Sequence, residues 1–262
     1  MSFLAKAQEE GYIVSVVPQF PQLVLVEQWQ PLLDELSQRL GVKFELETPE
    51  NIPKFEIDFL EGHPDFAFVN PYHVVMAYES QGYIPLISDG SRELNGILVV
   101  NANSDIDELS DLEGQTIAFP SPNAFGASLY MRALLAQEGL NFEPIYVETH
   151  SNVYRFVFLG QAAAGGGVRN TLSKEDEDLQ NQLKIIYETP GTRPHPIVAH
   201  PRVPEALREA LSEVLIDLYQ SPEGRLLLEA TQLNQPIRVS YEADYQKLDS
   251  LNLEDFVVIQ DF

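Results

Sequence analysis

The residues of this chain best suited to bind an anion lie in loops that follow expected strands. Arg169 follows three consecutive glycines, Gly165-Gly166-Gly167. A guanidinium binds a carboxylate or a phosphorus oxyanion with two parallel hydrogen bonds, and glycines let another group approach the backbone closely. Arg193, in a proline-stiffened turn, shows the same chemistry more weakly. The alternative for Arg169 is a surface salt bridge within an acidic chain.

A second candidate loop begins at Ser121 and leads into an expected helix. It contains Asn123, Ala124, Phe125 and Gly126. Small residues at a helix start let an anion reach the unpaired N–H groups and the positive end of the helix dipole. The alternative is an ordinary helix cap made by Ser121 or Asn123.

Three further loops also follow expected strands. Gln19 and Phe20 come after the first strand, and Tyr72 offers a ring and a hydroxyl in an Asn-Pro-Tyr turn. His150 stands in another strand-to-helix turn, where it can point at a ligand. The alternatives are a core position for Tyr72 and a surface or capping role for His150.

Motifs of catalysis and metal binding are absent from the sequence. It has no G-x-S-x-G elbow, no phosphate-loop lysine and no G-x-G-x-x-G. Its histidines, His63, His73, His150, His195 and His200, lack metal-ligand spacing, and it has no cysteine. We therefore expect neither a catalytic residue nor a metal or cofactor.

Strand and helix patterns alternate along the chain, which predicts an open α/β protein with parallel strands and ligands beyond the strand carboxyl ends. Apolar residues at helical spacing predict a helix from Leu25 to Leu40, ended by Gly41. The other expected helices are 71–80, 125–138, 152–160 and 204–220, and the expected strands are 12–17, 42–46, 65–69, 84–88, 96–101, 116–119, 145–148, 162–168, 185–188 and 197–200.

Composition excludes several classes of protein. The 262 residues contain 16 Lys and Arg against 40 Asp and Glu, a net charge of −24. Nucleic-acid binding and association with anionic membranes need the opposite charge. No run of 18 apolar residues can span a bilayer, and mutual repulsion favours a monomer. The first residues, MSFLAKAQEEGY, are too short and polar for a secretory signal, so the residues leave open a cytosolic protein or a mature exported chain.

Several segments, in this order, resemble the phosphonate- and phosphite-type solute-binding proteins of ABC importers. They are Val16-Val17-Pro18 before the helix residues 30–36, Phe66 to Tyr72, Asp111 to Phe119, His150, Pro196 to Ala199 before the Pro204 helix, and Glu242-Ala243-Asp244-Tyr245.

The resemblance implies a two-lobed type II periplasmic-binding-protein fold with a ligand cleft between α/β lobes. Lobe one would comprise residues 1–97 and 198–262, and lobe two residues 98–197, with hinge crossings near 98–100 and 197–199. It further implies a periplasmic or extracytoplasmic, non-catalytic protein. By this resemblance, the protein would close on a small anion and present it to an ABC permease or to a sensor in the membrane.

One loop departs from the pattern of that family. Its hydroxyl-rich clamp, typically Asp-Pro-x-Ser/Thr-x-Ser-Gly, is replaced by Ser121-Pro122-Asn123 followed by Ala124 and Phe125, and Arg169 replaces an acidic residue. This favours another anion, an organic carboxylate or a larger phosphorus compound, with Phe125 and Tyr72 covering its apolar part. Two alternative functions stay open, namely a ligand-sensing input domain and an enzyme with His150 as its base.

Overall fold

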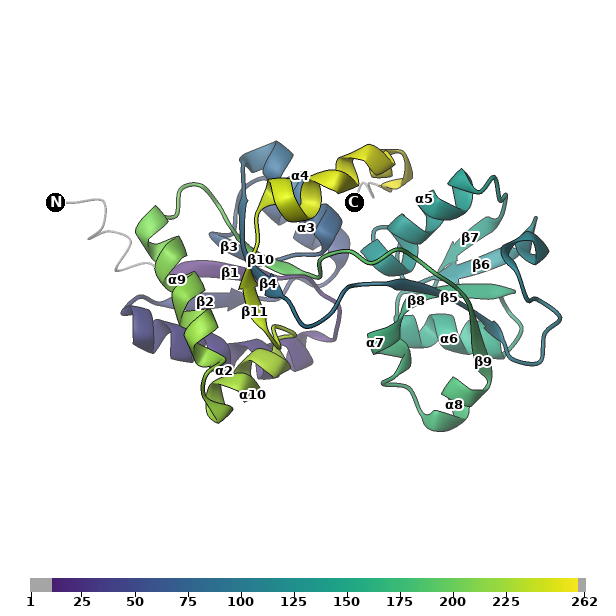
Figure 1. Cartoon of the computed structure of the whole chain (residues 1–262), viewed down its shortest axis with the longest axis horizontal. Helices are drawn as coiled ribbons and strands as arrows, with labels where there is room; N and C mark the ends of the chain where they lie inside the picture. The colour runs from purple at the N-terminus through teal and green to yellow at the C-terminus, as the bar shows by residue number, and fades with distance from the viewer. Residues whose placement is uncertain (1–10, 259–262) are drawn as a thin grey trace. The chain divides into compact units, whose positions relative to one another are not determined.

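The computed structural model describes residues 11–258, which form two compact units (Figure 1). Unit 1 comprises residues 11–93 and 193–248, and unit 2 comprises 94–192 and 249–258. The expectation about a secretory signal concerns residues 1–12, of which residues 1–10 lie outside this description. Within residues 11–258, no helix has both the length and the apolar character needed to cross a membrane.

Unit 1 is built on a six-stranded sheet in the order β11-β4-β10-β3-β1-β2. β1 pairs in parallel with β2 and β3, whereas β10 runs antiparallel to β3 and β4, and β11 antiparallel to β4. The strands are β1 (Tyr12–Val16), β2 (Phe44–Glu47), β3 (Phe66–Phe68), β4 (Ile84–Asp89), β10 (Pro196–Ala199) and β11 (Pro236–Arg238).

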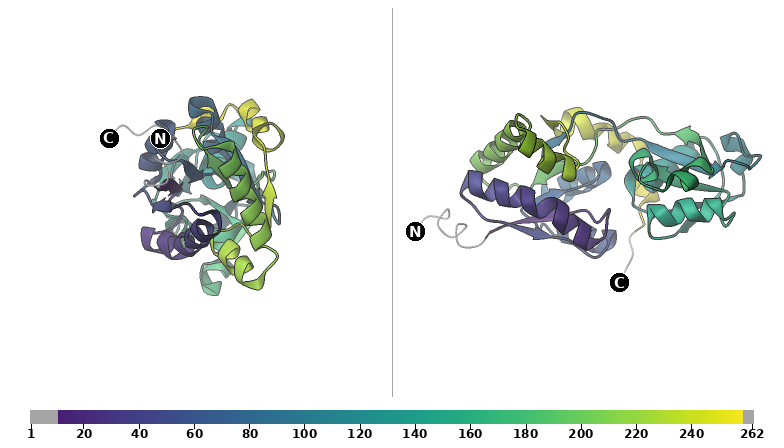
Figure 2. Two further views of the ribbon diagram at one scale, coloured as in Figure 1. Left: turned by 90° about the vertical axis from the view of Figure 1, so that its left-hand side faces the viewer. Right: turned by 90° about the horizontal axis from the view of Figure 1, so that it is seen from below.

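Two groups of helices pack with this sheet. α2 (Gln22–Leu40), α9 (Glu205–Leu218) and α10 (Pro222–Ala230) pack together, as Figure 2 shows, and α3 (Ile52–Leu60), α4 (Pro71–Gln81) and η3 (Tyr241–Tyr245) form the other group. α2 buries Leu25, Trp29 and Leu36 at helical spacing, and Trp29 contacts Phe68 of β3 at a ring distance of 4.8 Å. The helix ends at Gly41 in the left-handed conformation, as predicted.

Unit 2 is built on a five-stranded sheet in the order β7-β6-β8-β5-β9. β6 is parallel to β7 and β8, and β5 is antiparallel to β8 and β9. Its strands are β5 (Gly96–Asn101), β6 (Thr116–Phe119), β7 (Glu143–Tyr146), β8 (Ala164–Val168) and β9 (Leu183–Glu188). Its helices are η1 (Leu109–Leu112), η2 (Phe125–Leu129), α5 (Tyr130–Gln137), α6 (His150–Phe158), α7 (Arg169–Leu172), α8 (Glu177–Asn181) and η5 (Leu253–Phe256), and η4 (Gln246–Leu251) links unit 1 to unit 2.

Helices cover both faces of the unit 2 sheet, and successive side chains of β5 point to opposite faces, so both sets of side chains are buried. Leu98 and Val100 pack with Met131 of α5, whereas Ile97 packs with Val153 of α6. Figure 1 shows these two helices on opposite sides of the sheet. This explains why GILVVN is almost wholly apolar.

The glycines of β8 are explained by the packing of this protein itself. A Cβ on Gly166 would lie 2.0 Å from the carbonyl oxygen of Ala127 in η2, and one on Gly167 would lie 2.3 Å from the hydroxyl of Tyr154 in α6. A Cβ on Gly165 would lie 2.5 Å from Val153. The predicted close approach therefore comes from helices on both faces of the strand.

Some expected features differ from the structure. The sheets are mixed rather than parallel, because β10 of unit 1 and β5 of unit 2 run against their neighbours. The helices α3 and α10 and the strand β11 were not expected from the sequence.

The borders of the two units also differ from the expected lobe borders. The chain passes between units at residues 93/94, 192/193 and 248/249, whereas the expected crossings, 98–100 and 197–199, lie inside β5 and β10. The last passage was not expected at all. Residues 249–258 belong to unit 2 because Arg132 and Asn123 bind their backbone.

Candidate functional site

In unit 1 the candidate residues gather at the carboxyl edge of the parallel strands. Gln19 and Phe20 follow β1, and Tyr72 lies in the first turn of α4, directly after β3. β10 is antiparallel, so its first residue, Pro196, is at the same edge and pairs with Ser88 near the end of β4. This edge is where open α/β sheets bind ligands.

Tyr72 and Arg193 are held by their own unit. Tyr72 is buried, 6% exposed, so the alternative of a core position describes its surroundings. Asn70 caps α4, its side-chain oxygen accepting the backbone N–H of His73 at 2.8 Å. Arg193 donates from Nε to Asp244 at 3.3 Å, and both side chains are largely buried.

His195 was not expected as a site residue, yet it lies in the same edge of unit 1. Its ring stacks on Phe68 at 5.5 Å, and its Nε2 lies 2.5 Å from Nε2 of Gln19. Gln232 donates to Oε1 of Gln19 at 3.0 Å. Burial and the nearby charges of Arg92 and His73 lower the pKa of His195 to about 3, so the ring is neutral at pH 7.

In unit 2 the loop after β6 and the turn after β7 each bury a polar atom that has no hydrogen-bond partner in the described chain. These atoms are Oγ of Ser121 and Nδ1 of His150. β6 and β7 are parallel neighbours, so both atoms lie at the carboxyl edge of this sheet. Burial lowers the pKa of His150 to about 4, which keeps its ring neutral at pH 7.

The alternative in which Ser121 or Asn123 caps the helix is wrong. η2 begins after Ala124 with no side-chain cap. Instead, the Asn123 amide pairs with the backbone of Val258, accepting its N–H at 3.0 Å and donating to its carbonyl at 3.1 Å. Likewise, α6 is capped by Thr149 and not by His150. Both ends of the Asn123 amide thus hold the C-terminal segment.

The remaining residues of the unit 2 loop are packed. Phe125 is 3% exposed and stacks on Tyr130 at 5.3 Å. Gly126 is buried against Gly96, where a Cβ on Gly96 would meet the carbonyl oxygen of Gly126 at 2.0 Å. Ala124 is half-buried and accepts the backbone N–H of Ser128 at 2.8 Å.

Arg132 of α5 supports this loop and was not expected to be part of the site. Its side chain is buried, and its Nη2 donates to the carbonyls of Pro122 at 2.8 Å and Phe256 at 2.7 Å, while Nε donates to Ser128 at 3.2 Å. None of these acceptors is a carboxylate, and Arg132 forms no ion pair within residues 11–258. A buried cation paired only with neutral groups leaves a positive field at the loop. The signal in the sequence was a lone arginine in the apolar run YMRALL.

Arg169 is paired within the chain. Its Nε and Nη2 donate to the two carboxylate oxygens of Glu188 at 2.9 and 2.5 Å, with 60% of the arginine side chain exposed. Glu188, at the end of β9, is held at a lowered pKa by these hydrogen bonds. The surface salt bridge named as the alternative is thus present, and a contact of Arg169 with a ligand stays a prediction.

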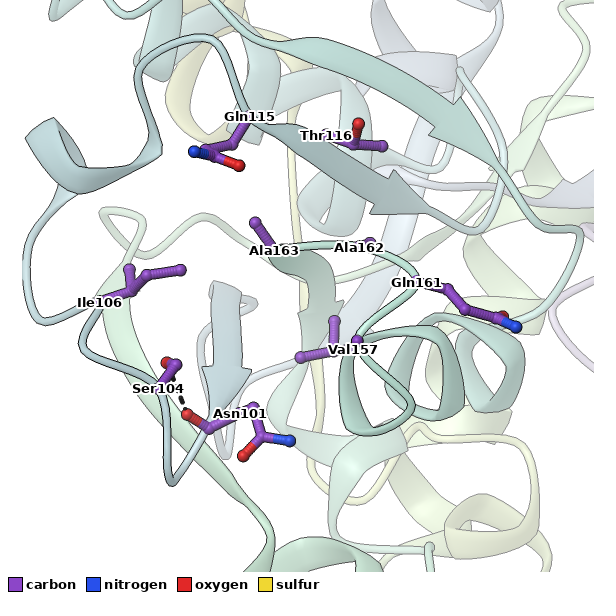
Figure 3. Close-up of a pocket in the computed structure, with 10 residues that line it drawn as sticks. Asn101, Ser104, Ile106, Gln115, Thr116, Val157, Gln161, Ala162 and Ala163 are labelled. Carbon is purple, nitrogen blue, oxygen red and sulfur yellow. Dashed lines mark hydrogen bonds between the residues drawn. The ribbon is translucent and has the colours of Figure 1, made fainter.

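A pocket of about 310 Å³ lies elsewhere in unit 2 (Figure 3). It is lined by Gln115 and Thr116 at and just before the start of β6, by Asn101 at the end of β5 with Ser104 and Ile106 beyond it, and by Val157 and residues 160–163. It therefore lies at the sheet edge opposite Ser121 and His150. None of its lining residues is charged, so it offers an anion no ionic partner.

The two mixed sheets, each with its own helices, define a class of protein, an open α/β protein of two units. Residues 14–245 match the family model described as the periplasmic substrate-binding protein of phosphonate ABC transporters. The chain belongs to this family. It is a solute-binding component of an ABC transporter, as the resemblance implied.

Solved structures share the fold at low sequence identity. PhnD1 from Prochlorococcus marinus, solved in complex with methylphosphonate, is 19% identical with a TM-score of 0.82, covering 94% of this chain and 98% of that one. XAC2383 from Xanthomonas citri, bound to chloride, is 17% identical with a TM-score of 0.82, covering 94% and 99%. A binding protein of a Pseudomonas aeruginosa phosphonate transporter is 16% identical with a TM-score of 0.77, covering 93% and 85%. The expected type II periplasmic-binding-protein fold is therefore confirmed.

Proposed function

We propose that this protein binds a small oxyanion, a phosphorus oxyanion or an organic carboxylate, at the carboxyl edges of its two sheets. The observation that carries the proposal is the loop at Ser121. There the buried Arg132 guanidinium, which has no carboxylate partner in residues 11–258, donates to the carbonyl of Pro122, and the neighbouring Ser121 buries a hydroxyl that has no hydrogen-bond partner in the same residues. A desolvated donor set beside a positive charge is stabilised by an anion. In a chain of net charge −24, such a place is unusual.

His150, Gln19 and Tyr72 complete the proposed site. Neutral His150 contributes a buried ring nitrogen beside the Ser121 loop, while Gln19 contributes an amide and Tyr72 a phenol ring from unit 1. Phe20, Arg169 and Arg193 are proposed at its rim. Asn123, Ala124, Phe125 and Gly126 are proposed to line the site as part of this loop, whose shape is set by their packing.

Binding is proposed to draw the two units together, with bending at residues 93/94, 192/193 and 248/249, where the chain passes between them. The closed form would be delivered, as a monomer, to an ABC permease outside the cytoplasm. No turnover is proposed, because His150 contacts no carboxylate in the described chain that would orient it as a base. The match to a transport family supports this proposal.

A ligand panel tests the proposal. Methylphosphonate, phosphite, phosphate, acetate and succinate are each added to the intact chain, and the melting temperature is measured. A solute at a hundred times its Kd stabilises the fold by about 2.7 kcal/mol, which raises the melting temperature by roughly 5–10 °C at this size. A shift for a phosphorus oxyanion or a carboxylate supports the proposal and chooses between them, and small-angle scattering then measures whether the radius of gyration falls. No shift across the panel contradicts it.

A further inference from the structure

A chain of side-chain hydrogen bonds in unit 1 runs from Arg92 to His195. Nη2 of Arg92 donates to Oε1 of Gln232 at 3.4 Å, and Nε2 of Gln232 donates to Oε1 of Gln19 at 3.0 Å. Nε2 of Gln19 then lies 2.5 Å from Nε2 of His195. Arg92 is itself anchored, since its Nε donates to the buried carboxylate of Asp89 at 3.2 Å. This series of hydrogen bonds from Arg92 through Gln232 and Gln19 to His195, called the relay below, therefore joins a fixed cation to the sheet edge at which Gln19 is proposed to bind the solute.

The chemistry of Arg92 sets the direction of every bond that follows. A guanidinium has five donors and no acceptor, so Gln232 must turn its amide oxygen toward Arg92 and its NH2 group toward Gln19. Gln19 must then accept through its oxygen, which turns its own NH2 toward His195. An amide nitrogen does not accept a hydrogen bond, so Nε2 of His195 carries no proton and the neutral ring is protonated at Nδ1. The reverse direction would set an N–H of Gln232 against an N–H of Arg92.

We propose that Arg92 and Gln232 are positioning residues that lock His195 as the Nδ1–H tautomer, so that Gln19 and His195 offer the solute only hydrogen-bond donors. The remaining donors are the second N–H of Gln19 and Nδ1–H of His195. Such an edge selects an acceptor, a deprotonated oxygen, and rejects an ammonium group. This inference rests on the proposed function, because it assigns a specificity to that site.

The backbone at Gln232 and at His195 fixes the positions of these two members of the relay. Gln232 has a φ of 65°, a left-handed position after α10 that favours glycine. A glutamine at this position makes side-chain hydrogen bonds to Arg92 and Gln19 that a glycine could not make. His195 stands between Pro194 and Pro196, and the Pro194 carbonyl accepts the hydroxyls of Ser88 at 2.9 Å and Tyr245 at 3.0 Å. With one face of its ring stacked on Phe68, the imidazole is fixed in place.

The tautomer is measured by long-range proton–nitrogen NMR on the intact, solute-free chain labelled with nitrogen-15 in histidine, with His195→Gln assigning the signal. The expected result is a proton on Nδ1 of His195. Gln232→Glu replaces the donor by an acceptor, so Gln19 turns its NH2 to Glu and its oxygen to His195, and the proton is expected to move to Nε2. Gln220→Glu makes the same chemical change at an exposed position of unit 1 and is expected to leave the tautomer unchanged.

Three results would overturn the relay: a proton on Nε2 in the unmodified chain, an unchanged tautomer in Gln232→Glu, or a doubly protonated ring in either. Binding is then measured with methylphosphonate as the probe. Gln232→Glu is expected to lose about tenfold or more in affinity, as for one lost hydrogen bond to a charged group, and Gln220→Glu is expected to lose none. An unchanged affinity with a switched tautomer overturns the role in specificity. An Nδ1–H tautomer in a chain that binds no solute of the panel leaves the relay intact and refutes the proposed function instead.

Discussion

At the scale of single residues, the loop at Ser121 differs from the loops that begin five of the helices. Five helix starts use a side-chain oxygen to accept a backbone N–H, those of Asn51, Asn70, Thr149, Ser221 and Ser240. Ser121 does not do this, and its buried Oγ has no partner in residues 11–258. A buried hydroxyl left unpaired costs about 1–3 kcal/mol. The proposed anion would remove that cost by accepting a hydrogen bond from the hydroxyl.

Ser121→Ala is therefore expected to weaken oxyanion binding without weakening the fold. A hydrogen bond to a charged group contributes about 1.5–3 kcal/mol, so Kd should rise tenfold or more while the free energy of unfolding stays equal or increases. Titration calorimetry with the best solute of the panel measures the first quantity, and urea unfolding the second. Ser110→Ala, exposed on η1 near the opposite end of β6, is the matched control. An unchanged Kd would remove Ser121 from the site.

Arg169 provides a second test at this scale, because its guanidinium is already bound to Glu188. If the solute competes for Arg169, then Arg169→Ala should raise Kd about tenfold or more, and Glu188→Gln, which frees the arginine and removes a negative charge, should lower it. Exposed ion pairs contribute at most about 1 kcal/mol to folding, so neither change should unfold the chain. Arg155→Ala, exposed on α6, is the control. Equal affinities in all variants would mean that the ion pair is purely structural.

At the scale of elements, β8 is a strand whose glycines let two helices approach it closely. Gly166→Ala places a Cβ 2.0 Å from the backbone oxygen of Ala127, which can move only if η2 moves. Overpacking that forces the backbone to shift costs about 1–3 kcal/mol, and here we expect the upper end of that range. Gly160→Ala meets no atom within 4 Å and has only its left-handed backbone to strain, at about 1 kcal/mol. Urea unfolding compares the two variants, and a smaller loss for Gly166→Ala than for Gly160→Ala would contradict the packing argument.

Asp89 joins the end of β4 to the segment before β11. Burial raises the pKa of its carboxyl, but the combined hydrogen bonds from Ser91, Asn234 and Gln235 outweigh burial and leave the pKa below its ordinary value of 3.8. A lowered folded pKa stabilises the fold fully above the unfolded pKa, and this stability is lost as the pH falls through the folded pKa.

Asp89→Asn is accordingly expected to lower the free energy of unfolding at pH 7 by about 3 kcal/mol, the scale of charged hydrogen bonds lost from a buried group. The difference from the unmodified chain should shrink as the pH falls below the ordinary pKa of 3.8 toward the lower pKa of the folded state, because the unfolded chain takes up its proton first. Urea midpoints from pH 7 to pH 3 measure this, with Asp34→Asn, exposed on α2, as the control. A difference that stays constant with pH would refute the role of the charge.

The sequence predicts strongly periodic elements better than short ones and local partners better than distant ones. α2 is long and amphipathic and ends at Gly41, so it is readily predicted. α3 has nine residues and β11 has three, too few for a periodic pattern, although Asn51 and Pro53 are start signals for α3. Gln19 contacts residues 176 and 213 positions away, and no local motif indicates such partners. The three glycines of β8 predict that another group packs closely against this strand, but they do not indicate whether that group is a helix or a ligand.

At the scale of the whole molecule, the chain passes between its units three times, whereas the resemblance implied two crossings. The third passage is followed by a segment that Arg132 and Asn123 hold to unit 2 through the backbone of Phe256 and Val258. Any hinge motion must therefore bend three segments rather than two. The same arginine donates to the carbonyl of Pro122 in the Ser121 loop, so the proposed binding loop and the third passage share one side chain.

The net charge of −24 acts on the molecule as a whole and opposes its compact state through self-repulsion. Salt shortens the reach of this repulsion, from about 30 Å at 0.01 M to about 8 Å at 0.15 M. The melting temperature should therefore rise as sodium chloride is added over this range and then level off. Chloride bound at a specific site would also stabilise the fold, but by an amount set by its own Kd. Sodium chloride and sodium gluconate at equal ionic strength separate the two causes, since screening raises the melting temperature equally in both. A flat or falling curve would mean that the pairing of acidic groups with Arg39, Lys43, Lys54 and Arg202, rather than their repulsion, dominates the charge energy of the fold.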